Sequence, residues 1–113
     1  MKRLIRKASN NPVIEGIRKM TDKSMIEKAM YNITKTIANN ILSVDKISNE
    51  GELYENIVQY LKEDPNYISE NLDIPDELVD ALNALDDNQT IELNDYLIND
   101  FDAAMGKAID DII

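Results

Sequence analysis

Apolar residues recur along most of this chain at steps of three and four, the spacing of one face of an α-helix. The clearest stripe runs through residues 24–47 and contains Ile26, Met30, Ile33, Ile37, Ile41 and Val44. No stretch of useful length alternates apolar and polar residues, as a half-buried strand would. The pattern therefore predicts an all-α fold.

Two shorter helices are predicted ahead of this stripe. Asn11 can cap a helix over about 12–20 with Pro12 at its first position, where proline loses no backbone hydrogen bond. Residues 2–8 form the other, because their apolar residues share one face and their basic residues the opposite face. Both helices belong to the basic part of the chain.

The next two helices are predicted from their start signals. Ser24 followed by Glu27 is a capping-box pattern that opens the long helix, which we expect to end near Ile47. Asn49 then precedes a helix over about 50–63. Its inward-facing residues are predicted to be Leu53, Ile57, Tyr60 and Leu61.

The C-terminal half predicts three more segments. A short helix or turn follows Asp64–Pro65 and extends to about Leu72, and a helix over 73–85 presents Leu78, Leu82 and Leu85. Asp86–Asp87–Asn88 ends that helix. A last helix is expected from about Thr90 to the C-terminus, although its first turn could instead be extended. Its apolar face contains Leu93, Leu97, Phe101, Ala104, Ala108 and Ile112. We therefore expect five to seven helices in one compact bundle, a single domain of residues 1–113.

Charge divides the chain into two unlike parts. Residues 1–46 contain ten Lys or Arg and four Asp or Glu, a net of +6, whereas residues 47–113 have a net of −16. Between Glu63 and Gly106 there are thirteen carboxylates and no Lys or Arg. A segregation this sharp indicates either an internal electrostatic match or an external partner.

The composition argues against most catalytic chemistry. The chain has no His and no Cys, so it cannot build Ser-His or Cys-His nucleophile systems or the usual zinc sites. Its three glycines are isolated, which excludes a Gly-rich phosphate loop, and Asp86, Asn88 and Thr90 lack the glycine and terminal glutamate of a calcium loop. We expect a protein that is not an enzyme and uses no cofactor or metal.

The sequence also bears on location. No signal-peptide core follows the basic start, and no apolar run is long enough to cross a membrane. A small chain that needs no disulfide fits the cytoplasm. We expect a cytoplasmic protein with no membrane partner.

The acidic half has two interpretations. On the last helix, Glu92, Asp95, Asn99, Asp102 and Asp110 lie opposite the apolar face. Like charges three or four residues apart cost a few tenths of a kcal/mol each, so this arrangement forgoes stability. It is either a solvated face that maintains solubility or a surface that occupies a partner's basic groove, as a nucleic-acid mimic does. Carboxylates on one helix face are about 5–6 Å apart, close enough to imitate backbone phosphates.

We favour the second interpretation as a hypothesis. The predicted partner is a basic, nucleic-acid-handling protein, which this chain would inhibit. By analogy, small acidic helical inhibitors of this kind often come from phages or other mobile elements and block host or defence nucleases. The predicted partner-binding residues are Asp73, Asp76, Glu77, Asp80, Glu92, Asp95 and Asp102, with Tyr67 and Tyr96 as aromatic anchors.

The basic half leaves three alternatives open. Its Lys and Arg side chains can lie across the acidic helices and neutralise them within one molecule. The same complementarity between chains would give a self-associating module, such as a homodimer. Direct nucleic-acid binding through residues 2–28 is the third, but a net charge of −10 repels the duplex, and residues 13–33 fit a helix-turn-helix poorly.

Overall fold

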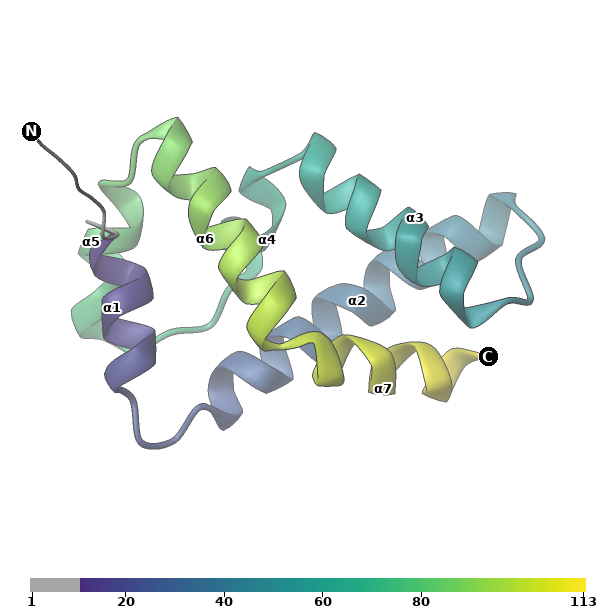
Figure 1. The fold of residues 1–113 in the computed structure, drawn as a ribbon, viewed down its shortest axis with the longest axis horizontal. Coiled ribbons are helices and arrows are strands. Elements are labelled where there is room, and N and C mark those ends of the chain that lie inside the picture. The colour runs from purple at the N-terminus through teal and green to yellow at the C-terminus, as the bar shows by residue number, and fades with distance from the viewer. Residues whose placement is uncertain (1–10) are drawn as a thin grey trace, which may run out of the picture.

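The computed structural model describes residues 11–113, which contain seven helices and no strand (Figure 1). The prediction of an all-α bundle is confirmed, whereas the helix predicted over 2–8 lies outside the described residues. The helices are α1 (Pro12–Lys19), α2 (Ser24–Val44), α3 (Glu50–Glu63), α4 (Asn66–Asn71), α5 (Asp76–Asn83), α6 (Asp87–Asp100) and α7 (Asp102–Ile112).

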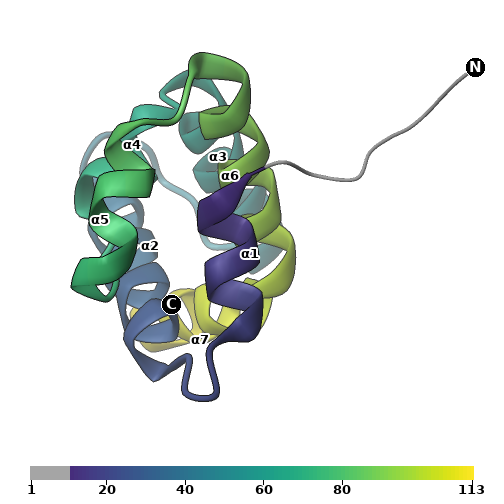
Figure 2. The same cartoon turned by 90° about the vertical axis from the view of Figure 1, so that its left-hand side faces the viewer.

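The long helix α2 organises the bundle. At one end α7 and α3 pack against it, and at the other end α1 packs against α5 and α6 (Figures 1 and 2). The helix α4 bridges α2 and α6. The two chemically different parts of the sequence are thus interleaved, because α1 and α2 from the basic part are each covered by helices from the acidic part.

The predicted stripe of α2 forms the centre of the core. Ile26, Met30, Ile33 and Ile37 are all buried, whereas Val44 at the end of the helix is 79% exposed. Fully burying one such side chain contributes about 1.5–3 kcal/mol. The helix ends at Val44, three residues before the predicted end.

The structure confirms the predicted helix starts at Asn11 and Asn49 and contradicts the capping box predicted at Ser24. The Asn11 side chain accepts hydrogen bonds from the first turn of α1, and the Asn49 side chain accepts one from the Glu52 amide at the start of α3. The capping box at Ser24 is wrong, because the N-cap is Lys23 and has no side-chain hydrogen bond. The Asp22 carboxylate instead accepts the Ser24 N–H, at 2.9 Å.

The predicted last helix is two helices. The side chains of Asp86 and Gln89 form a capping box that starts α6 at Asp87, three residues earlier than predicted. The backbone then breaks at Phe101, whose side chain is buried and packs edge-on against Tyr96. The break lets α6 pack on α1 and α3 while α7 follows α2.

Two predicted inward faces are less buried than expected. Tyr60 on α3 is 40% exposed, so the prediction that it faces inward is wrong. The helix α5 has no fully buried residue, and Leu78, Leu82 and Leu85 are only partly buried against the core. The helix α5 therefore rests on a thinner apolar contact than α2 and α7.

Candidate protein-binding surface

The acidic face predicted for the last helix is divided between two helices by the break at Phe101. Glu92 and Asp95 on α6 and Asp102 and Asp110 on α7 are all exposed. Within each helix they lie on the side opposite the buried apolar residues. The exposed carboxylates therefore come in one pair on α6 and one pair on α7.

Two residues in the first half of α3 contact the carboxylates of α7. The Tyr54 hydroxyl donates a hydrogen bond to Asp102, with an O–O distance of 2.6 Å, and the Glu50 and Asp110 carboxyl groups are in hydrogen-bonding contact. We call Glu50, Glu92, Asp95, Asp102 and Asp110, the exposed carboxylates of α6 and α7 described above together with Glu50 of α3, the acidic seam.

A buried amide fixes α3 against α6 beneath the seam. The Asn94 side chain, 3% exposed, donates from Nδ2 to the Leu61 carbonyl oxygen at 3.1 Å. Leu61 and Leu97 are fully buried nearby in the core. The acidic seam is therefore carried by helices whose relative positions are held by a polar and an apolar contact.

The electrostatics of the seam show crowding of negative charge. The pKa of Glu50 is raised above its ordinary value because its carboxyl group shares a hydrogen bond with Asp110 and is repelled by that carboxylate. Burial, followed by the hydrogen bond to Asp102, raises the pKa of Tyr54 to about 12. The shift in the pKa of Glu50 reflects its hydrogen bond with Asp110 and repulsion by the Asp110 carboxylate, and an approaching cation would relieve that repulsion.

The predicted carboxylates of the Asp73–Asp80 segment lie apart from the seam, on and just before α5. Asp73, Asp76, Glu77 and Asp80 are all exposed, and α5 lies at the α1 end of the molecule, away from α7 (Figure 1). Asp73 borders a surface hollow with Lys28, and Glu77 borders another with Lys19. The structure therefore divides the predicted acidic residues into two groups.

The two predicted aromatic anchors are partly buried. Tyr67 packs edge-on against Tyr60, with ring centroids 5.5 Å apart, and burial raises its pKa. The guanidinium of Arg18 lies over the Tyr96 ring, 5.3 Å from its centroid. Neither ring belongs to the acidic seam.

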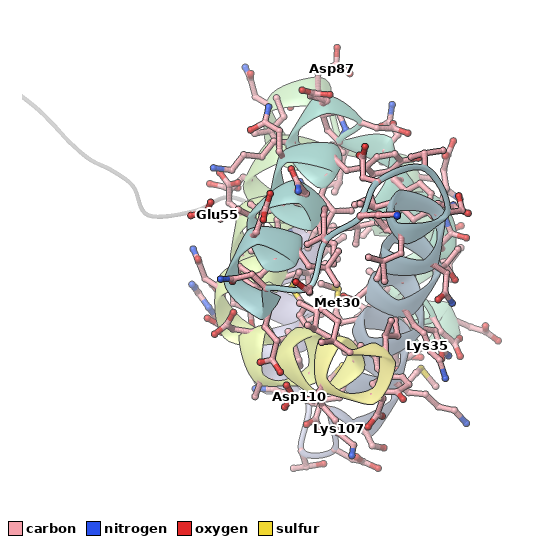
Figure 3. The ribbon with its side chains drawn as sticks, turned by 90° about the vertical axis from the view of Figure 1, so that its right-hand side faces the viewer. Met30, Lys35, Glu55, Asp87, Lys107 and Asp110 are labelled. Carbon is pink, nitrogen blue, oxygen red and sulfur yellow. The ribbon has the colours of Figure 1, made fainter. Side chains whose placement is uncertain are left out.

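Within residues 11–113, no Lys or Arg forms an ion pair closer than 4 Å with Glu50, Asp95, Asp102 or Asp110. Within residues 11–113, the ion pair closer than 4 Å is Arg18–Glu15, at 3.8 Å, and both of its residues belong to α1. In Figure 3, Lys35 on α2 and Glu55 on α3 lie on opposite sides of the molecule. Asp110 lies at the foot of α3 in the same view.

Sequence reasoning missed the contribution of α3 to this surface. Glu50, Tyr54 and Val58 share one helix face, since they are four residues apart, but the spacing does not reveal which helix they meet. Their pairing with α6 and α7 follows from the tertiary structure alone.

Residues 11–113 contain no group of three or more carboxylates placed to hold a metal ion. None of their helices is long and apolar enough to span a bilayer. Comparison of the chain with models of protein families, with curated proteins and with solved structures gave no match.

Proposed function

We propose that this protein is a non-enzymatic, cytoplasmic binding protein whose acidic seam engages a basic, nucleic-acid-handling protein and blocks it. The observation that carries the proposal is the set of exposed carboxylates on α6 and α7, two of which contact α3 through Tyr54–Asp102 and Glu50–Asp110. Electrostatic complementarity of this kind accelerates and orients association with a cationic surface.

The arrangement favours a binding surface over a merely solvated face. Carboxylates maintain solubility wherever they lie on the surface. In the seam, however, Glu50 lies against Asp110, and the two carboxylates repel each other. A partner whose lysines and arginines normally bind phosphates would relieve that repulsion. On this proposal the protein acts as a nucleic-acid mimic, of the type that phages and other mobile elements encode against host nucleases.

A pull-down from extracts of the source cells tests the proposal. The wild-type chain should retain a basic protein that binds DNA or RNA, and added nucleic acid should compete with the retention. The variant Asp95→Lys/Asp102→Lys/Asp110→Lys should retain none of it. Because the triple variant also removes the Tyr54 hydrogen bond, Tyr54→Phe serves as a control that should still capture the partner. A retained partner with an acidic surface, or one indifferent to nucleic acid, would refute the proposal.

A second candidate function is self-association, favoured by the exposed Lys28 and Lys35 of α2 and the exposed carboxylates of the seam in one chain. The lysine side of α2 in one copy would face the seam of the next. Light scattering measured as the salt concentration rises distinguishes self-association from binding to a different protein. Salt screens exposed charges and therefore dissociates an assembly that they hold together. A monomer at all salt concentrations would eliminate this candidate.

A further inference from the structure

Three tyrosines of this protein are paired with aspartates of α6 and α7. The pairs are Tyr31 with Asp111, Tyr54 with Asp102, and Tyr96 with Asp100. Each joins a phenol to a carboxylate, so each offers a cation both an aromatic face and a negative charge.

A cation already lies over two of the three rings. Lys35 Nζ lies 5.7 Å from the centroid of the Tyr31 ring, and Arg18 Cζ lies 5.3 Å from that of Tyr96. Within residues 11–113, no cation lies over the Tyr54 ring. The Tyr54–Asp102 pair is therefore the incomplete member of a repeated arrangement.

A hollow of about 360 Å³ opens beside this pair, between α3 and α6. Its apolar surface comes from Val58, which is partly buried, and Ile98, which is 6% exposed. Asp95 and Asn99, which supply oxygen acceptors, and the Tyr54 ring also line it. The hollow thus combines apolar side chains, an aromatic ring and a carboxylate of the acidic seam.

We infer that this hollow receives an arginine side chain of the basic partner. The aliphatic stem of arginine would cover Val58 and Ile98, and its planar guanidinium would meet Asp95 and the Tyr54 ring. Arginine suits the site better than lysine, because a guanidinium stacks on rings and binds carboxylates through two parallel hydrogen bonds. Arg18 over Tyr96 is an example of the stacking within the same molecule. The inference rests on the proposed function and identifies the anchoring side chain of that partner.

Lys62 also borders the hollow, one turn beyond Val58 on α3. It is exposed, and its ammonium group is a local cation that an incoming arginine must accommodate. Removing this charge should therefore strengthen arginine binding, whereas removing Asp95 should weaken it. The opposite signs separate specific recognition from a general loss of structure.

Titration of isotopically labelled protein with Nα-acetyl-arginine amide, followed by two-dimensional amide NMR, tests the inference. The arginine compound should shift the amide signals of Val58, Asp95 and Asn99 saturably, and the corresponding lysine compound should bind more weakly. Asp95→Asn should weaken arginine binding about threefold, and Lys62→Ala should strengthen it. The matched control Asp76→Asn, on α5, should leave it unchanged.

The outcomes are distinguishable from those of the proposed function. Equal shifts at α5 and at the hollow, or shifts that never saturate, would overturn the arginine site. If the arginine site is overturned in this way but the pull-down still retains a basic nucleic-acid-binding protein, the seam binds that protein through charge alone. If no such protein is retained and the arginine compound still binds at the hollow, the site stands and its proposed partner is wrong.

Discussion

The acidic seam and α5 carry similar densities of carboxylates but differ in their neighbours. On the seam, Glu50 lies against Asp110, and the Tyr54 hydroxyl is held by Asp102. Around α5, Asp73 and Glu77 each share a hollow with a lysine from the basic half. Asp95 of the seam also shares a hollow with a lysine, Lys62. The two regions therefore differ in the contacts that Glu50 and Asp102 make, not in whether a lysine is near, and a count of acidic residues alone does not locate a binding surface.

The two regions also differ in packing. The helix α7 buries Met105, Ala108 and Ile109 against α2, whereas α5 buries no residue completely. A protein surface that must present charges in fixed positions benefits from the better-packed support. The seam has that support and α5 has less of it.

The largest expected effect concerns this packing. Met105→Ala in α7 should lower the free energy of unfolding by about 2–5 kcal/mol, because it leaves a cavity in a fully buried site. Leu82→Ala in α5 should cost about 1 kcal/mol, since Leu82 is only partly buried. Urea denaturation measures both, and equal losses would show that the two regions are packed alike.

Two of the three helical glycines, Gly16 and Gly106, test the same contrast on a smaller scale. Nothing lies within 4 Å of the position that a Cβ of Gly106 would occupy in α7, so Gly106→Ala should stabilise by about 0.5–1 kcal/mol. A Cβ on Gly16 in α1 would collide with the Leu78 side chain of α5. Gly16→Ala should therefore gain nothing or destabilise. Thermal unfolding measures both, and an equal gain would contradict the close approach of α1 to α5.

Alkaline pH should act on the seam through Tyr54. Its pKa in the folded protein, about 12, exceeds its ordinary value of 10.0 because burial and Asp102 disfavour the phenolate. The fold therefore holds the proton more tightly than the unfolded chain, and this stabilisation is present below pH 10 and lost as pH rises towards 12. Tyr54→Phe should reduce the loss. Tyr96→Phe should reduce it less, because Arg18 opposes the rise in the pKa of Tyr96. Urea denaturation at pH 9 to 12 compares the variants, and identical pH profiles for all three proteins would contradict the account.

The smallest effect is expected from Glu50. Its raised pKa means that the folded protein favours the protonated carboxyl, so the cost of its charge appears as pH rises above its ordinary pKa of 4.5. Glu50→Gln should raise the midpoint of thermal unfolding slightly at neutral pH and leave it unchanged well below pH 4. Glu55→Gln on the outer side of the same helix is the matched control (Figure 3). A rise of the same size in the control would show that net charge is responsible, not the contact with Asp110.

The sequence predicts much of the fold because the helix signals are local. The stripe of α2 is recognised from steps of three and four residues, and the caps at Asn11 and Asn49 bind amides two or three residues further along the chain. The break at Phe101 could not be predicted, because the helical pattern continues through it and only packing against different neighbours separates α6 from α7. For the same reason the sequence indicates which residues share a helix face but not that Glu50 meets Asp110.

The most direct test of the central claim is a comparison of two charge-reversed triple variants. One is Asp95→Lys/Asp102→Lys/Asp110→Lys on the seam, and the other is Asp76→Lys/Glu77→Lys/Asp80→Lys on α5. Each reversal adds two positive charges, so both variants have a formal net charge of −4 instead of −10. Calorimetric titration with the basic partner should show about a 100-fold loss of affinity for the seam variant and little change for the α5 variant. Equal losses would show that net charge, and not the seam, governs binding.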